Sequence, residues 1–303
     1  MIKHLVCCCL LIITTFSSAK EAESVGVGYS LNGEHKFITG YKKANRYIFN
    51  QESNRIVHLV TLDWPPYIGE HLCNKGWVFQ FAVALLTSKG YQVQIEFLPW
   101  ARAVHAVELG QADILFPEYY IEDAAPSDNV KGKKRRELLA LSNEFPGGEI
   151  GFIKRKGEKD NFAGNLSHLE GENIGVVRGY QNTPEFDAMM DNNEFNVVKA
   201  VDDLQLLRIL VAKRVNLVIG DPKVLRFIIN YSDLSHKEKT ELVTSIEDVE
   251  PALKYNPLYF ALSNKNPNWS RLLVDINTAL YEFYNSGETT RIKNAASLTC
   301  MGG

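Results

Sequence analysis

The sequence has few residues of the kinds that build metal or catalytic centres. Three of its five cysteines stand together near the N-terminus, and the other two, Cys73 and Cys300, are far apart. A zinc site needs ligands that are more closely clustered than this, and the seven histidines are also scattered along the chain. We find no P-loop, no HExxH motif and no nucleophile–base pair. We therefore expect no metal, no cofactor and no enzymatic activity.

The chain also lacks an excess of basic charge. Its net charge is -3, from 33 Lys and Arg against 36 Asp and Glu. We therefore expect no positive electrostatic field that would attract nucleic acid. Hydrophobic residues make up 45% and charged residues 23%, as in an ordinary globular protein. A chain of 303 residues exceeds one compact domain, which favours two lobes.

Long apolar runs are absent except at the N-terminus. Leu5–Ile13 is apolar but too short for a transmembrane helix, and it follows the basic pair Lys3-His4. Small residues then end at Ala19, which is the layout of a secretory signal. We expect residues 1–19 to be cleaved and the protein to be periplasmic, with an uncleaved anchor as the alternative. Cleavage leaves Cys73 and Cys300, an even pair that suggests one disulfide; two free thiols are the alternative.

The segment Leu59–Tyr67 (LVTLDWPPY) predicts one wall of a ligand cleft. It begins as an apolar strand, and Pro65-Pro66 ends it because proline has no N–H for a sheet ladder. Asp63, Trp64 and Tyr67 then lie on a stiff loop at the strand's carboxyl end, where open α/β sheets bind ligands. The alternative is that these aromatics only cap the core.

The rest of the chain predicts two α/β units with a hinge near Pro146-Gly147-Gly148. In the first unit, alternating strands and helices imply a β-α-β-α-β order and a parallel sheet. The second unit repeats the pattern, and a late strand at Leu242–Ile246 carries the chain back. The boundaries that we expect are residues 20–54 for an N-terminal extension with a hairpin turning at Asn32-Gly33, 55–146 for lobe 1, 147–246 for lobe 2, and 247–303 for the return to lobe 1.

Several segments resemble a known family when they are taken in order. They are DWPPY, PWARAVHAVELGQADILF, RRELLALSNEF, IGVVRGYQ and VNLVIGD. Over about Val57–Ala295 the chain resembles the family 3 periplasmic solute-binding proteins, the amino-acid receptors of ABC importers. The resemblance implies an α/β, two-lobed, periplasmic-binding-protein-like (type II) fold. Each lobe would have a central, mainly parallel sheet flanked by helices, and two hinge strands would join the lobes.

The resemblance also assigns roles to individual residues. The aromatic over the ligand falls on Trp64, and a polar trio falls on Pro117, Glu118 and Tyr120. The family's carboxylate-binding arginine corresponds to Arg135, and its acidic residue that binds the ligand's amino group corresponds to Asp221. The second-lobe turn becomes Gly179-Tyr180-Gln181. Gly132 replaces the family's threonine, and Glu118, Tyr120, Tyr180 and Gln181 replace small hydroxyl residues, so this site is bulkier and more acidic.

Each of these residues also has a plainer interpretation. Arg135 could hold a carboxylate with two parallel bonds or could be a solvated loop arginine. Asp221 could accept from an ammonium, could cap the helix that starts at Pro222, or could do both. Glu118 could balance a cationic ligand or stand at a solvent-exposed rim. Four aromatic side chains could stack on the ligand: Trp64, Tyr67, Trp100 and Tyr180. For Trp100, packing in the core is the favoured interpretation.

These observations predict a monomeric protein that captures a small polar solute, an amino acid or a related metabolite, by closure of its lobes. Delivery to an ABC permease in trans is the function that the family implies. A ligand-sensing partner of a membrane signalling protein is the main alternative. A lyase or dehydratase is the other, and it would use Glu118 or Asp221 as a buried acid.

Overall fold

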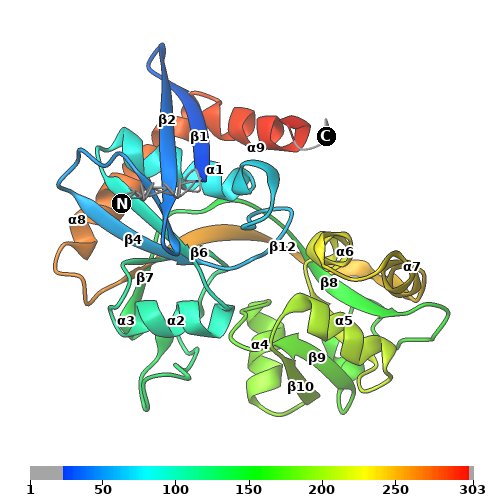
Figure 1. The fold of residues 1–303 in the computed structure, drawn as a ribbon. Helices are drawn as coiled ribbons and strands as arrows, with labels where there is room; N and C mark the ends of the chain where they lie inside the picture. The colour runs from blue at the N-terminus through cyan, green and yellow to red at the C-terminus, as the bar shows by residue number, and fades with distance from the viewer. Residues whose placement is uncertain (1–22, 300–303) are drawn as a thin grey trace, which may run out of the picture.

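The computed structural model describes residues 23–299 and shows two α/β lobes (Figure 1). The beginning and the end of the described chain form lobe 1, and the middle of the chain forms lobe 2. The predicted signal segment and Cys300 lie outside the described residues, so the signal and the disulfide remain predictions. Within the described part of the chain, no helix is long and apolar enough to cross a membrane.

Lobe 1 has a sheet with helices packed around it. Its strands are β1 (Ser24–Leu31), β2 (Glu34–Lys43), β3 (Arg46–Phe49), β4 (Ile56–Thr61), β5 (Gln92–Phe97), β6 (Ile114–Glu118) and β7 (Leu139–Leu141). Its helices are η1 (Cys73–Lys75), α1 (Trp77–Ser88), α2 (Trp100–Glu108), α3 (Arg135–Leu138), α8 (Trp269–Asn285) and α9 (Glu288–Thr299). Strand β4 pairs in parallel with β5 and with β6, so the predicted β-α-β-α-β order is confirmed.

Lobe 2 repeats this plan with a smaller sheet. Its strands are β9 (Asn173–Val177), β10 (Asn196–Ala200) and β11 (Leu217–Gly220), and its helices are η2 (Leu166–Leu169), α4 (Pro184–Asp191), α5 (Asp203–Val211), α6 (Pro222–Tyr231) and α7 (His236–Thr244). The Thr183 side chain caps α4, as predicted, by accepting from the Phe186 N–H.

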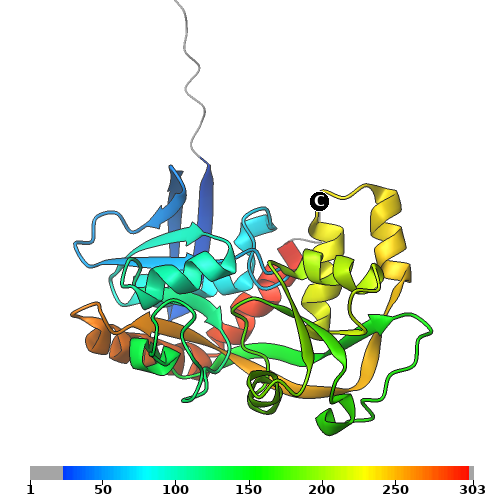
Figure 2. The ribbon, with the colours of Figure 1, turned by 90° about the horizontal axis from the view of Figure 1, so that it is seen from below.

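Two long antiparallel strands connect the lobes. They are β8 (Phe145–Arg155) and β12 (Ile246–Ser263), which pair from Ile246 opposite Arg155 to Leu258 opposite Phe145. The register shifts between Val249 and Lys254, and β12 then continues into lobe 1, where it pairs with β6 and β7. Figure 2 shows the two strands crossing from one lobe into the other. The predicted two-strand hinge is therefore present.

The sheet is mixed rather than mainly parallel. One connected strand order runs β1-β2-β3-β5-β4-β6-β12-β8-β11-β9-β10, because β8 and β12 belong to both lobes. The strands at the hinge and those at the N-terminus pair antiparallel. The expectation of mainly parallel sheets thus holds only for the central strands of each lobe.

The N-terminal extension belongs to lobe 1. The predicted hairpin forms, with Asn32 and Gly33 at φ values of 53° and 80° between the paired residues Leu31 and Glu34. The strand β3, which we did not predict, joins this hairpin to β5. The extension therefore contributes to the core, since Tyr47 is fully buried.

The predicted strand Leu242–Ile246 is wrong over most of its length. Residues His236–Thr244 form α7, whose first turn is capped by Ser235 and Glu238 in a capping box. That Ser-x-x-Glu spacing was visible in the sequence, and only Ile246 belongs to the following strand.

Candidate functional site

One wall of the interlobe space is the loop after β4. The Trp64 N–H donates to the Ile68 carbonyl at 2.8 Å, which folds the loop back on itself. The Trp64 and Tyr67 rings stack with centroids 4.5 Å apart, and the edge of Tyr119 meets Trp64 at 5.7 Å. Gly76 lets α1 start directly beneath, since a Cβ there would lie 2.5 Å from the Tyr67 carbonyl oxygen. The two aromatics are therefore held rigidly.

Tyr67 joins this wall to lobe 2. Its hydroxyl donates to Asp221 Oδ2 at 2.8 Å, and the other carboxylate oxygen accepts from the N–H groups of Lys223 and Val224 at the start of α6. Burial raises the pKa of Asp221, and the bond from Tyr67 opposes that effect. Gly148 of β8 lies against the pair, and a Cβ there would clash with both side chains. Asp221 thus caps a helix and also contacts the opposite lobe.

A second interlobe contact comes from the start of α2. Trp100 Nε1 donates to the Gly179 carbonyl at 2.9 Å, and the Trp100 and Tyr180 rings meet edge to face at 5.8 Å. Trp100 is only 5% exposed, so it packs in the core and at the same time forms a wall of the site. The core packing predicted for Trp100 is confirmed, and its stacking on a ligand stays a prediction.

Tyr180 rests on a buried carboxyl group within lobe 2. Its hydroxyl donates to Asp203 Oδ2 at 2.8 Å. Burial raises the pKa of Asp203 to about 7, the Tyr180 bond opposes this, and the nearby Asp202 and Asp221 carboxylates add to it. Asp203 therefore lies in a place that disfavours negative charge as long as no cation is near.

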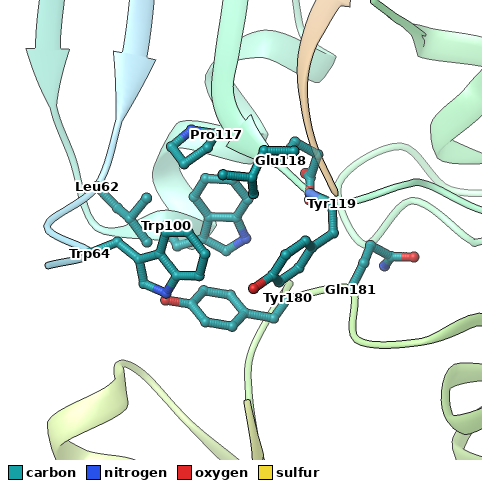
Figure 3. Close-up of a pocket in the computed structure, with 9 residues that line it drawn as sticks. Leu62, Trp64, Trp100, Pro117, Glu118, Tyr119, Tyr180 and Gln181 are labelled. Carbon is teal, nitrogen blue, oxygen red and sulfur yellow. The ribbon is translucent and has the colours of Figure 1, made fainter. Parts of the chain in front are cut away.

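Between these walls lies a small pocket, shown in Figure 3. Its volume is about 20 Å³, little more than one water needs, because aromatic rings fill most of the space. Its lining comes from both lobes and comprises Leu62, Trp64, Trp100, Pro117, Glu118, Tyr119, Tyr180, Gln181 and Leu258. A larger groove of about 430 Å³ opens beside it and shares Gln181.

A buried ionic triad supports the lobe 1 side of the pocket. Arg135 Nε donates to Glu108 at 3.1 Å, and Arg135 Nη2 donates to Glu118 at 2.8 Å. The three side chains are 5%, 0% and 1% exposed. Burial raises the pKa of the Glu118 carboxyl, and the adjacent Arg135 lowers it. The guanidinium is thus already engaged by the protein's own carboxylates.

The fold matches known structures. A histidine kinase sensor domain with similarity to periplasmic binding proteins aligns at TM-score 0.63 and 17% identity, over 81% of this chain and 97% of that chain. An ancestral arginine-binding protein bound to arginine aligns at TM-score 0.61 and 19% identity, over 80% of this chain and 98% of that chain. An arginine transport system periplasmic binding protein from Legionella pneumophila aligns at TM-score 0.60 and 15% identity, over 80% of this chain and 100% of that chain.

The fold is that of the periplasmic binding proteins. At these identities the likeness establishes the architecture and nothing finer. No family model and no curated protein matches the sequence. The fold class that the sequence predicted is confirmed.

Within this binding-protein fold, most of the predicted site residues come together. Trp64, Trp100, Glu118, Tyr180 and Gln181 line the pocket, and Gly179 bonds to Trp100. Tyr67 and Asp221 form the interlobe bond at its side. Their role in holding a ligand stays a prediction.

Three predicted residues lie elsewhere. Asp63 is exposed and accepts from the Glu70 N–H at 2.6 Å, which places it outside the pocket. Tyr120 is 45% exposed and packs on Tyr259. Arg135 borders the neighbouring groove behind Glu118.

Sequence reasoning missed Tyr119 and Asp203. Consecutive residues of an extended chain point to opposite sides, so the choice of Tyr120 over its neighbour selected the outward-facing tyrosine. Asp203 resembled an ordinary residue of the first turn of a helix, because nothing in the sequence showed that Tyr180 would reach it. Among the described residues, no group of His, Cys, Asp or Glu is arranged to hold a metal ion.

Proposed function

We propose that the protein is a periplasmic solute-binding protein that captures a small polar solute, an amino acid or a related metabolite, between its lobes and delivers it to an ABC importer. The observation that carries the proposal is the set of contacts across the cleft. Tyr67 meets Asp221 and Trp100 meets Gly179, each at hydrogen-bond distance, on lobes that two strands join. Such lobes can part and close about a hinge.

The proposal includes a monomer that leaves its solute chemically unchanged. Asp221 and Glu118, the candidate acids for a lyase, are both occupied. Asp221 accepts from Tyr67 and from two backbone N–H groups, and Glu118 accepts from Arg135 and from the Tyr119 N–H. Both carboxyl groups therefore already serve as hydrogen-bond acceptors within the protein.

A sensing role is the second candidate, and one observation favours it. The sensor domain of a histidine kinase shares this fold at TM-score 0.63. The same closure would then report the solute to a membrane protein on a separate chain. A pull-down from membranes with and without solute distinguishes the two, since an importer contributes a permease and a sensor system contributes a signalling protein.

A thermal-shift screen over amino acids, amines and small organic acids tests the proposal. A solute at 100 times its Kd should stabilise the protein by about 2.7 kcal/mol, because it binds only the folded state. For a chain of this size that is a rise in Tm of roughly 4–5 °C. NMR of the solute after long incubation should show it unchanged. If no compound raises Tm, or if the solute is converted, the proposal is wrong.

A further inference from the structure

The groups around the pocket carry an unbalanced negative charge. Four buried carboxyl groups lie near the pocket, each at most 4% exposed: Glu108, Glu118, Asp203 and Asp221. Among the described residues, Arg135 is the one buried cation that forms an ion pair with any of them, and its partners are Glu108 and Glu118. The four carboxylates and one guanidinium carry a net charge of −3 when Asp203 is ionised and −2 when it is protonated. Within residues 23–299, Asp203 and Asp221 have no ion pair. A positive charge in the pocket would relieve this imbalance.

The surface that faces the pocket is aromatic. Figure 3 shows the rings of Trp64, Trp100, Tyr119 and Tyr180 gathered around one space. The hydroxyl of Tyr180 donates to a carboxylate behind the ring, which makes the ring face more electron-rich. Faces of this kind attract cations, most strongly where water is excluded.

Tyr119 adds an observation that is independent of the charges. It is 6% exposed, it lines the pocket, and its hydroxyl has no hydrogen-bond partner in the described part of the chain. Buried hydroxyls are nearly always paired, so an orphaned one indicates a missing partner. Burial raises the pKa of this hydroxyl, and the carboxylates of Asp221, Asp203 and Glu118 add to that effect. The negative charge around the hydroxyl favours a positively charged N–H group, from which the hydroxyl oxygen can accept.

Among the described residues, no Lys or Arg lines the aromatic pocket to anchor a ligand carboxylate there. Arg135 borders the neighbouring groove; its Nε and Nη2 donate to Glu108 and Glu118, and its buried Nη1 has no partner in the described part of the chain. A ligand carboxylate in the aromatic pocket would add a further negative charge to the cluster. Like charges in a buried site cost several kcal/mol, so this arrangement selects against carboxylates.

We propose that the aromatic pocket binds a small organic cation without a carboxylate, an amine or alkylammonium, in preference to an α-amino acid. The proposal rests on the solute-binding function proposed above and narrows its ligand class. Tyr180 and Gln181 come from lobe 2, so parting of the lobes opens the pocket, and closure brings the last ring against the cation.

Calorimetric titration of the purified chain with matched probes tests the proposal. Agmatine keeps the guanidinium and side chain of L-arginine but lacks its carboxylate, and cadaverine bears the same relation to L-lysine. Choline tests the alkylammonium arm. We expect at least one amine or choline to bind, and each amino acid to bind at least about tenfold more weakly than its decarboxylated partner.

Substitutions at Tyr180 separate the ring from its hydroxyl. Tyr180→Leu removes the ring and should weaken binding of the cation about 30-fold, whereas Tyr180→Phe keeps the ring and should cost only a few-fold. Tyr281→Leu on α8 is the matched control, because Tyr281 is 70% exposed and outside the pocket lining. Circular dichroism confirms that each variant is folded.

The outcomes distinguish this proposal from the broader one. Tighter binding of L-arginine or L-lysine than of agmatine or cadaverine would overturn the cation proposal and leave the solute-binding function standing. Equal loss of binding in Tyr180→Leu and Tyr281→Leu would also overturn it. If no compound in any class binds, both proposals fall.

Discussion

Replacing Arg135 by methionine should lower the free energy of unfolding by about 3–5 kcal/mol, because it leaves two buried glutamates without their counter-charge. Arg135 contacts Glu108 and Glu118 at 3.1 and 2.8 Å, and all three side chains are at most 5% exposed. Urea denaturation followed by circular dichroism measures the change. The loss should shrink at acid pH, where the glutamates take up protons.

Two further variants show whether buried charge is the cause. Lys133→Met removes an exposed partner of Glu137 and should cost at most about 1 kcal/mol. Adding Glu108→Gln and Glu118→Gln to Arg135→Met should recover much of the stability, since no uncompensated charge then remains. A loss below 1 kcal/mol for Arg135→Met alone would mean that this arginine is free for a ligand.

Replacing Asp203 by asparagine should stabilise the protein at pH 8 and leave it unchanged at pH 4. The pKa of Asp203 is raised to about 7 by burial, against 3.8 for an ordinary aspartate. Between these values the folded protein keeps a proton that the unfolded chain releases, so the wild type loses stability as pH rises. About three pKa units correspond to a gain on the order of 4 kcal/mol for Asp203→Asn, slightly reduced by the lost charge at the start of α5.

Denaturation curves at pH 4, 6 and 8 measure this effect, and Asp202→Asn is the matched control. Asp202 is the exposed N-cap of α5, and asparagine caps a helix as well as aspartate does. Asp202→Asn removes one charge that raises the pKa of Asp203, so its curves should depart slightly from the wild type at pH 8 and far less than those of Asp203→Asn. Parallel curves for Asp203→Asn and the wild type would show that Asp203 does not retain its proton.

Much of the fold could be predicted because its signals are local. The run of apolar residues in β4, the turn at Asn32-Gly33 and the cap at Thr183 are each fixed by neighbours in the sequence. Strand β3 was missed because four residues carry too short a pattern, and its partner β5 comes only after β4 and α1 in the sequence. The segment of α7 was misassigned because its apolar residues were given more weight than its capping box.

The site was harder to predict because its key contacts are distant in sequence. Tyr67 and Asp221 are 154 residues apart, and Glu118 and Arg135 come together only when the loop after β6 folds back. The family resemblance suggested that Arg135 and Asp221 would face a ligand. Only the packed structure shows that each already has a partner within the protein.

Fluorine NMR of protein labelled with 5-fluorotryptophan tests the central claim most directly, that the space between the lobes is a solute site. The chain has four tryptophans; Trp64 and Trp100 line the pocket, and Trp269 starts α8 outside it. Single Trp→Phe variants assign the resonances. Titration with a solute from the thermal-shift screen should shift the Trp64 and Trp100 signals to saturation at one Kd and leave Trp269 in place. A solute that binds while both pocket signals stay unmoved would contradict the account.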